Sequence, residues 1–237
     1  MSDRVLTSIT QRAGDWPGES GSPPSRPASY EEYLSLSAGG RLVEWVNGHI
    51  IYHMPPTTLH QLIADYLGLL LSLFVEFFNQ GRVIRAAFEM KCRPDGPSRE
   101  PDLIYVSNAH LSRLDDRRLN GPADLAVEVV SEDSVTRDYD EKYVEYEECG
   151  VREYWLIDPR PRRQRALFYQ LDENGKYDLV KPIQGVYRSR TAPGFWLKVD
   201  RIWQRPDPQL TFAEIAGFPP EIVAFLKAQK QKGLEQR

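Results

Sequence analysis

The spacing of apolar and polar residues in the first half of the chain predicts a hairpin followed by a long helix. Two β-prone runs within residues 43–52 flank Asn47-Gly48, a pair that is typical of two-residue hairpin turns. Residues 59–78 are apolar around nearly the whole helical circumference, and Thr57 or Thr58 can cap the start of the helix. Such a helix lies at the centre of a fold or in a subunit interface.

Shorter patterns predict a mixed α/β chain. Ser29 and Glu32 have the spacing of a capping box, which indicates a short helix from residue 30. An amphipathic helix is expected from Thr136 to about Glu148. Strands are expected at residues 82–92, 102–106, 123–130 and 152–157, with further antiparallel strands within 163–200.

We expect one domain with an extension at each end. Residues 1–27 are rich in Ser, Pro, Gly and Arg without periodicity, which predicts a disordered or loosely attached tail. Residues 28–205 carry the strand and helix patterns of the domain. Residues 206–237 predict a C-terminal helical extension, broken at Pro219-Pro220.

Composition and motifs narrow the class of protein. A length of 237 residues, with 41% hydrophobic and 27% charged residues, suits one globular domain with tails. The net charge of −4 argues against a protein that coats nucleic acid through bulk electrostatics, but it allows a local basic groove. The chain contains no internal repeat, Walker A loop, GxGxxG or GxSxG motif, which removes the commonest nucleotide-binding and hydrolase classes.

The cysteines and the first residues indicate a cytoplasmic protein. Cys92 and Cys149 are the only cysteines, and neither lies in a CxxC or Cys/His cluster, so we expect no disulfide framework and no zinc site. The first ten residues lack the basic and apolar segments of a signal peptide. Polar residues such as His60 and Asp65 interrupt the long apolar run, so we expect no membrane span.

Two acidic residues on β-prone segments carry the strongest chemical signal. Glu128 lies between Val127 and Val129, where an ionised carboxylate is costly to bury unless a cation or strong donors meet it. A Mg²⁺ or Mn²⁺ ion shared with Asp102 would compensate that cost, since these hard ions prefer oxygen ligands. Two other interpretations stay open: Glu128 faces solvent or pairs with an arginine, and Asp102 merely ends a loop after Pro101.

Lys142 follows the two acids on the predicted helix. Asp138 precedes it by four residues, and Glu145 and Tyr146 follow by three and four, so all lie near one helical face. An exposed helix with ordinary ion pairs explains this spacing equally well. The order of an acid, an acid on an apolar strand, a short polar loop and a lysine favours a site.

In combination with further segments, these residues resemble the Uma-two-like restriction endonuclease family, which is part of the PD-(D/E)XK nuclease superfamily. The resemblance covers about residues 29–200, and the Glu-Pro-Asp and Gly-Val-x-Glu-Tyr-Trp segments contribute most to it. The matching segments are Val43-Glu44-Trp45-Val46-Asn47-Gly48, His60, Arg99-Glu100-Pro101-Asp102-Leu103, Leu125-Ala126-Val127-Glu128-Val129-Val130-Ser131, Tyr139-Asp140-Glu141-Lys142, Tyr146 and Gly150-Val151-Arg152-Glu153-Tyr154-Trp155-Leu156-Ile157-Asp158-Pro159.

The resemblance implies a fold and a set of site residues. The fold is α/β (α+β) and restriction-endonuclease-like: a mixed central sheet flanked by helices, with additional antiparallel strands and a C-terminal helix. Asp102 and Glu128 would bind the metal, with Glu44 as an accessory acid and further metal ligand. Lys142 would fill the superfamily's lysine role, with His60 and Tyr146 as candidate accessory residues.

This chain departs from the superfamily's usual Glu-x-Lys spacing. The position two after Glu128 is Val130, so the lysine has moved to the following helix. We expect a Mg²⁺- or Mn²⁺-dependent endonuclease that hydrolyses phosphodiester bonds of nucleic acid, with DNA as the expected substrate. The alternative is an inactive nuclease-fold binding protein, which the acidic net charge and the displaced lysine favour.

Two further hypotheses concern the reaction and the oligomeric state. A hydrolase that uses the same acids on a different substrate is a third candidate, although the sequence offers no positive sign of it. The nearly all-round apolar helix at residues 59–78 predicts self-association, with a homodimer as the expected form.

Overall fold

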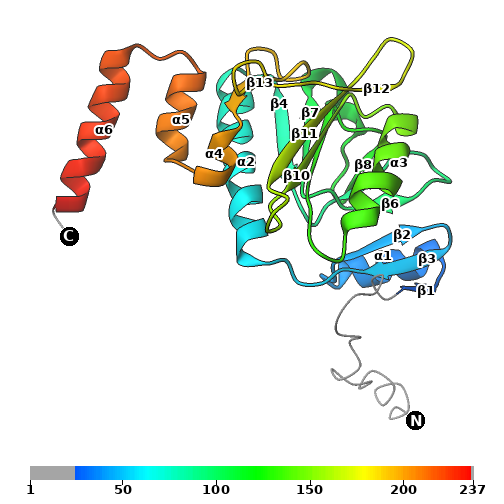
Figure 1. The fold of residues 1–237 in the computed structure, drawn as a ribbon. Coiled ribbons are helices and arrows are strands. Elements are labelled where there is room, and N and C mark those ends of the chain that lie inside the picture. Colours follow the sequence, from blue (N-terminus) through cyan, green and yellow to red (C-terminus); the bar gives the residue numbers. More distant parts are fainter. Residues whose placement is uncertain (1–24, 236–237) are drawn as a thin grey trace.

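The chain folds into two six-stranded β-sheets with helices packed around them (Figure 1). The computed structural model describes residues 25–235, and all element bounds lie within that part of the chain. The helices are α1 (Tyr30–Ala38), α2 (Thr58–Phe77), α3 (Lys142–Cys149), α4 (Asp200–Gln204), α5 (Pro208–Ile215) and α6 (Pro220–Glu235), with a 3₁₀-helix η1 (Asn108–Arg113) and a π-helical turn η2 (Arg137–Glu141). The mixed α/β architecture expected from the sequence is confirmed.

The central sheet contains one parallel pair of strands, β9 and β10, and its other neighbouring strands are antiparallel. Its order is β12 (Tyr177–Leu179), β11 (Arg165–Leu171), β10 (Glu153–Asp158), β9 (Leu125–Val129), β7 (Leu103–Ser107) and β4 (Gly81–Arg85). Parallel strands need a crossover connection between them. Between β9 and β10 this connection contains η2 and α3.

The second sheet is also mixed, because its edge pair β5 and β8 is parallel. Its order is β1 (Ser25–Pro27), β3 (His49–Tyr52), β2 (Val43–Val46), β6 (Ser98–Arg99), β5 (Glu89–Lys91) and β8 (Arg118–Asn120). A separate ribbon pairs β13 (Val186–Arg188) with β14 (Trp196–Lys198). Strands β11 to β14 include the additional antiparallel pairs that the sequence predicted.

The predicted hairpin of residues 43–52 is confirmed as β2 and β3. Val46 pairs with His49, and the two turn residues Asn47 and Gly48 have φ angles of 49° and 77°. Positive φ at both positions is what a type I′ turn requires, and Asn and Gly adopt it at the least cost.

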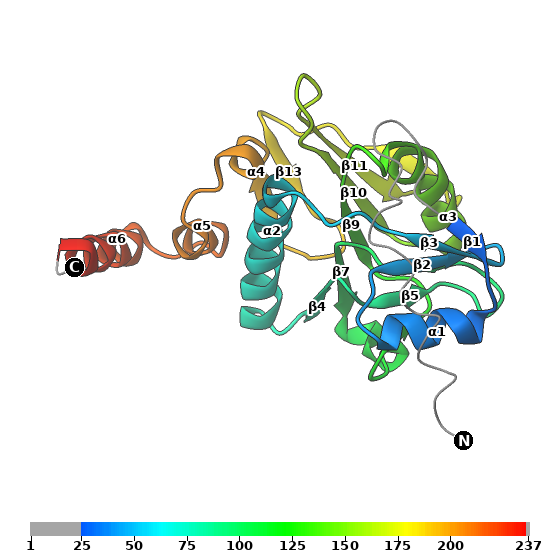
Figure 2. The same ribbon diagram turned by 90° about the horizontal axis from the view of Figure 1, so that it is seen from below.

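Helices α2 and α3 cover opposite faces of the central sheet (Figures 1 and 2). Along β9, Leu125, Val127 and Val129 belong to the core cluster on the α2 face, whereas Ala126 lies in the cluster beneath α3. Successive side chains of a strand alternate between the two faces. Glu128 therefore faces α3, which is the helix that carries Lys142.

Helix α2 is the core helix that the all-round apolar pattern predicted. Thr57 caps it by accepting a hydrogen bond from the His60 backbone N–H at 3.3 Å. Among the described residues it is the one helix long and apolar enough to cross a membrane by length and composition. Its buried residues, such as Leu67 and Leu71, instead pack against the central sheet.

Four segments differ from the sequence-based expectations. Residues 82–92 form two strands, β4 and β5, in different sheets, and the helix of residues 136–148 begins as the π-helical turn η2. Helix α4 was not predicted. Residues 25–27 were assigned to the tail, but they form β1 by pairing with β3; the rest of that tail, residues 1–24, lies outside the described residues. The spacing of apolar residues shows which positions of a strand are buried. It does not show which sheet the strand joins, so it cannot reveal that β4 and β5 belong to different sheets.

Cys92 and Cys149 form a disulfide, with Cα atoms 5.7 Å apart. Cys92 follows β5 directly and Cys149 is the last residue of α3, so the bond ties α3 to the second sheet. The expectation that the cysteines form no disulfide is therefore wrong. The two residues are 57 positions apart, and their spacing in the sequence gives no sign that the fold brings them together.

The C-terminal helices break where Pro219-Pro220 predicted. Helix α5 packs against α2, and α6 packs against α5. Both helices extend away from the sheets in Figures 1 and 2.

Candidate active site

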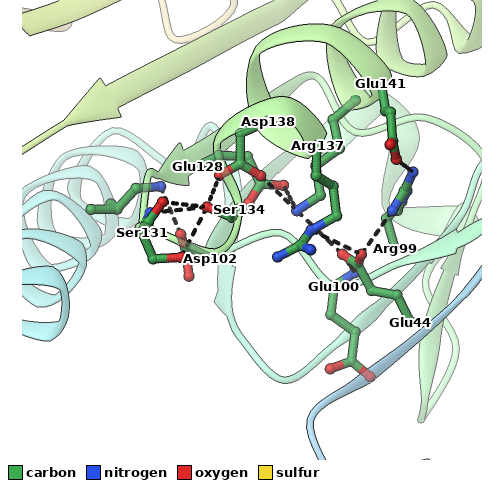
Figure 3. A network of polar contacts seen from close by, with 12 residues as sticks. Glu44, Arg99, Glu100, Asp102, Glu128, Ser131, Ser134, Arg137, Asp138 and Glu141 are labelled. Carbon is green, nitrogen blue, oxygen red and sulfur yellow. Dashed lines mark hydrogen bonds and ion pairs between the residues drawn. The ribbon is translucent and has the colours of Figure 1, made fainter. Parts of the chain in front are cut away.

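A cleft of about 210 Å³ opens between the start of α2, the ends of β7 and β9, and the turn η2. Its lining includes His60, Asp102, Glu128 and Lys142, which are four of the residues singled out by the sequence. Glu44 and Tyr146 lie behind the cleft wall, where Glu44 contacts Lys142 and Tyr146 contacts Glu128. Figure 3 shows how the polar side chains of this region converge.

Asp102 and Glu128 each present one engaged and one unengaged carboxylate oxygen. Oδ2 of Asp102 accepts the Val129 backbone N–H at 2.7 Å, and Oε1 of Glu128 accepts the Tyr146 hydroxyl at 2.7 Å. No described residue donates a hydrogen bond to Oδ1 of Asp102 or to Oε2 of Glu128. Both carboxylates line the cleft, so their remaining oxygens are available for a cation or water.

Lys142 is buried among carboxylates. Its Nζ lies 2.9 Å from Glu128 Oε1, 3.2 Å from Glu44 Oε1 and 3.4 Å from Asp138 Oδ1. Burial alone would lower the pKa of Lys142, but the charges of these three carboxylates outweigh it and raise the pKa above its usual value. The helical position after β9 therefore does bring the displaced lysine to the acids.

Glu128 is a carboxyl whose ionised form is disfavoured by its surroundings. Burial raises the pKa of Glu128 to about 8, against the opposing charge of Lys142. The nearby Asp138, Asp102 and Glu44 raise it further because like charges oppose ionisation. A carboxyl in this position gains strongly from a bound cation.

Asp138 belongs to the same cluster, although sequence reasoning noted it only as a neighbour of Lys142. It is buried, it pairs with Lys142, and its Oδ2 accepts a short hydrogen bond from the Ser134 hydroxyl. Burial raises the pKa of Asp138 above its usual value. The i,i+4 spacing to Lys142 was the available signal, but an exposed ion pair has the same spacing.

Glu44 joins Lys142 to a second buried cation, Arg99. Oε2 of Glu44 lies 2.9 Å from Arg99 Nη1, and Oε1 accepts the Glu100 backbone N–H at 3.2 Å. Burial would raise the pKa of Glu44, but the charges of Lys142 and Arg99 hold it well below its usual value. Both Glu44 oxygens are thus engaged by cations or backbone.

Arg99 is a site residue that sequence reasoning missed. Its guanidinium also binds Glu145 of α3 through Nε and Nη2, each at 2.7 Å. It therefore connects β6 to α3 and fixes the helix that carries Lys142. Its position in the Arg-Glu-Pro-Asp segment gave no indication of this role, because its partners lie far away in the sequence.

His60 contacts Asp102 from the other side of the cleft. Its Nε2 lies 3.2 Å from Oδ2 of Asp102. Burial would lower the pKa of His60, but the hydrogen bond and the charge of Asp102 raise it above its usual value. His60 thus holds the carboxylate that the sequence proposed as a metal ligand.

The donor set suits a small, hard cation held by few protein ligands. Among residues 25–235, no three His, Cys, Asp or Glu side chains converge as a metal site. Structural zinc needs four such ligands, whereas Mg²⁺ is commonly held by one or two carboxylates together with water and substrate phosphate. Asp102 and Glu128, each with an unengaged oxygen in one cleft, fit the second arrangement.

Comparisons with known proteins show the family and the fold of this chain. A family model described as "Uma2: Putative restriction endonuclease" matches residues 30–200. A crystal structure described as "a putative nuclease" from Anabaena variabilis ATCC 29413 is similar with 19% sequence identity and a TM-score of 0.61, covering 75% of this chain and 98% of that chain. No curated protein matches. At this identity the structural similarity shows a shared fold, which confirms the predicted fold class.

Proposed function

Because this chain belongs to the Uma2 family of putative restriction endonucleases, we propose that it is a divalent-metal-dependent endonuclease that hydrolyses phosphodiester bonds, with DNA as its substrate. One observation carries the proposal. Asp102 and Glu128 present unengaged carboxylate oxygens to the same cleft, next to the buried Lys142.

Asp102, Glu128 and a main-chain carbonyl near Val129 would hold Mg²⁺ or Mn²⁺. Such an ion, when bound, lowers the pKa of a coordinated water and neutralises charge on the phosphoryl oxygens. Neighbouring residues of this chain orient the two carboxylates. The Val129 N–H and His60 orient Asp102, while Tyr146 and Lys142 orient Glu128.

Lys142 and Glu44 have supporting positions in this proposal. Lys142 offsets the charges of Glu128 and Asp138, which lets several carboxylates share one buried region. Glu44 stays the accessory acid. A metal could bind its oxygens only if Glu44 gave up its ion pair with Lys142 or with Arg99. The lysine's role at the reacting water, proposed from the family, requires Lys142 to release one carboxylate.

Plasmid cleavage tests the proposed activity. Wild-type protein with Mg²⁺ or Mn²⁺ should nick or linearise supercoiled plasmid, and Asp102→Ala and Glu128→Ala should each abolish cleavage because they remove a metal ligand. Glu132→Ala is the matched control, since it removes an acid four residues from Glu128 whose side chain is 79% exposed. Cleavage at the wild-type rate by either site variant would refute the assignment.

The second candidate is a nuclease-fold binding protein without turnover. Its motivation is the engagement of Lys142 by three carboxylates, together with the acidic net charge. Calorimetric titration with Mg²⁺ and Mn²⁺ separates the candidates. Metal binding that is lost in Glu128→Ala supports the enzyme, whereas a folded protein that binds neither ion supports the binding protein.

Self-association and location are two further parts of the proposal. Most of the apolar surface of α2 is covered within the chain, but Leu59, Leu62 and Leu69 stay exposed on its outer side. We propose that this side contributes to a homodimer, and light scattering that detects only monomer at micromolar concentration would refute it. A cytoplasmic location also stays a proposal, and the disulfide counts against it, because such bonds are typical of oxidising compartments.

A further inference from the structure

Arg137 is a buried cation whose charged end faces the cleft. It is the first residue of η2, and its side chain is only 5% exposed. Its guanidinium lies between Glu44 and the loop of Ser131 and Ser134 in Figure 3. Arg137 lines the same cleft as Asp102 and Glu128.

The guanidinium has few partners for a group with five N–H donors. Its Nη2 lies 3.3 Å from Nδ1 of His53, while the nearest carboxylate oxygens, of Asp133 and Glu44, are 3.8 Å and 3.9 Å away. Its Nε has no hydrogen-bond partner in the part of the chain that the structure describes. Leaving such donors unsatisfied in a buried site is costly, so the arrangement points to a missing acceptor.

Lys142 differs from Arg137 in this respect. Three carboxylates surround Lys142 within 3.4 Å, and its side chain is 3% exposed, so its donors are directed at protein oxygens. An incoming anion would have to displace one of these carboxylates. Arg137 can accept an anion without breaking an ion pair of that quality.

His53 helps to fix the orientation of Arg137. A guanidinium can only donate, so Nδ1 of His53 must be the acceptor of their contact. Nε2 of the same ring lies 3.4 Å from Glu44 Oε2. His53 therefore lies between Arg137 and Glu44 and contacts the guanidinium from one side.

We propose that Arg137 binds the phosphate of the substrate through its non-bridging oxygens. That the phosphate belongs to a nucleic acid strand rests on the proposed function. The anion site itself does not depend on it. The planar fork of a guanidinium matches two phosphate oxygens. The cleft also carries the carboxylates of Asp102, Glu128 and Asp133, so an anion needs such a cation to enter.

Two probes test the proposal without any turnover. The first is inorganic phosphate, detected by its effect on the melting temperature and by ³¹P line broadening. The second is a short fluorescein-labelled DNA duplex, titrated without divalent metal at several salt concentrations. The variants are Arg137→Gln and Arg137→Lys. Arg152→Gln is the matched control, because Arg152 is 61% exposed and lies at the opposite end of β10 from the cleft.

Arg137→Gln should lose phosphate binding and weaken duplex binding by about 10- to 100-fold, the range for a charged hydrogen bond in a buried site. The slope of log affinity against log salt should fall by about 1, because one phosphate contact is lost. Arg137→Lys should keep most of the slope but bind less tightly, since it retains the charge without the fork. Arg152→Gln should behave as wild type.

The outcomes separate this inference from the proposed function. Arg137→Gln that binds both probes as tightly as wild type, or wild type that binds neither, would overturn the inference. Loss of cleavage with intact, Arg137-dependent phosphate binding would instead refute only the endonuclease. If circular dichroism shows that Arg137→Gln does not fold, Arg137→Lys tests the inference instead. Unchanged duplex affinity, salt slope and phosphate binding in Arg137→Lys would refute binding of phosphate by the planar guanidinium.

Discussion

Replacing Lys142 by methionine should destabilise the protein by about 3 kcal/mol at pH 7. Methionine preserves much of the lysine's volume, so packing is little disturbed and the lost charge dominates. Removing Lys142 leaves Glu44, Glu128 and Asp138 together in a buried region without their shared cation. Breaking a buried ion pair from one side typically costs about 3–5 kcal/mol.

A second estimate comes from the protons that the variant must bind. The charge of Lys142 opposes the rise in the pKa of Glu128 that burial and the neighbouring carboxylates cause. Without Lys142, at least one carboxyl of the cluster must be protonated in the folded state. For a glutamate of ordinary pKa 4.5 this costs about 3 kcal/mol at pH 7 and about 1 kcal/mol at pH 5. The two estimates agree at pH 7.

The sign of the pH dependence follows from the same proton balance. The folded variant holds more protons than its unfolded chain above pH 4.5, so its stability falls relative to wild type as pH rises. Urea unfolding followed by tryptophan fluorescence at pH 5 and pH 7 measures the difference. Lys176→Met is the control, because the Lys176 side chain is 69% exposed, so its ion pair with Glu147 contributes at most about 1 kcal/mol.

Two results would refute this reasoning. A loss below about 1 kcal/mol at pH 7 would mean that the carboxylates do not depend on Lys142 for their burial. A loss of the expected size that does not shrink at pH 5 would mean that packing, and not charge, is responsible.

Three further predictions concern Glu128, the disulfide and the hairpin turn. The pKa of Glu128 is raised from 4.5 to about 8, so the native state keeps a proton that the unfolded chain releases, and this residue's contribution to stability falls between those pH values. Mg²⁺ should therefore raise the melting temperature more at pH 9 than at pH 6, and calorimetry should show no such difference in Glu128→Gln. Cys92→Ser should cost up to about 4 kcal/mol, from closure of a 57-residue loop, and dithiothreitol should lower the melting temperature of wild type but not of the variant. Gly48→Ala should lower the free energy of unfolding by about 1 kcal/mol, because φ is 77° at this position and strains an alanine. A Cβ there meets no atom within 4 Å, so no clash adds to this loss. An unchanged midpoint of urea unfolding would contradict the turn geometry.

Local sequence determined the elements whose causes are local. Asn47-Gly48 specifies the hairpin because both residues tolerate positive φ, and the apolar circumference of residues 59–78 specifies the helix that is α2. The apolar run around Glu128 predicted the strand that is β9, but it left open whether the carboxylate faces solvent. These features depend on residues within a few positions of each other, so a single sequence contains the information.

The family resemblance added the expected site residues, and the structure brings four of them to one cleft and places Glu44 and Tyr146 behind it. The sequence did not indicate the second buried cation. Arg99 contacts Glu44 across 55 residues of chain, and no local pattern reports such a distance.

What only the tertiary structure decided is how the charges are shared. From the sequence, Lys142 and Asp138 could have been an exposed helical pair, and Arg137 an ordinary surface arginine. The fold buries all three at the cleft that Glu128 lines. The lysine's Nζ lies among carboxylates, whereas Nε of Arg137 has no hydrogen-bond partner among the described residues. The physical reason is that the energy of a charge depends on its solvent exposure and on partners from distant segments, and both are set when the sheets and α3 pack together.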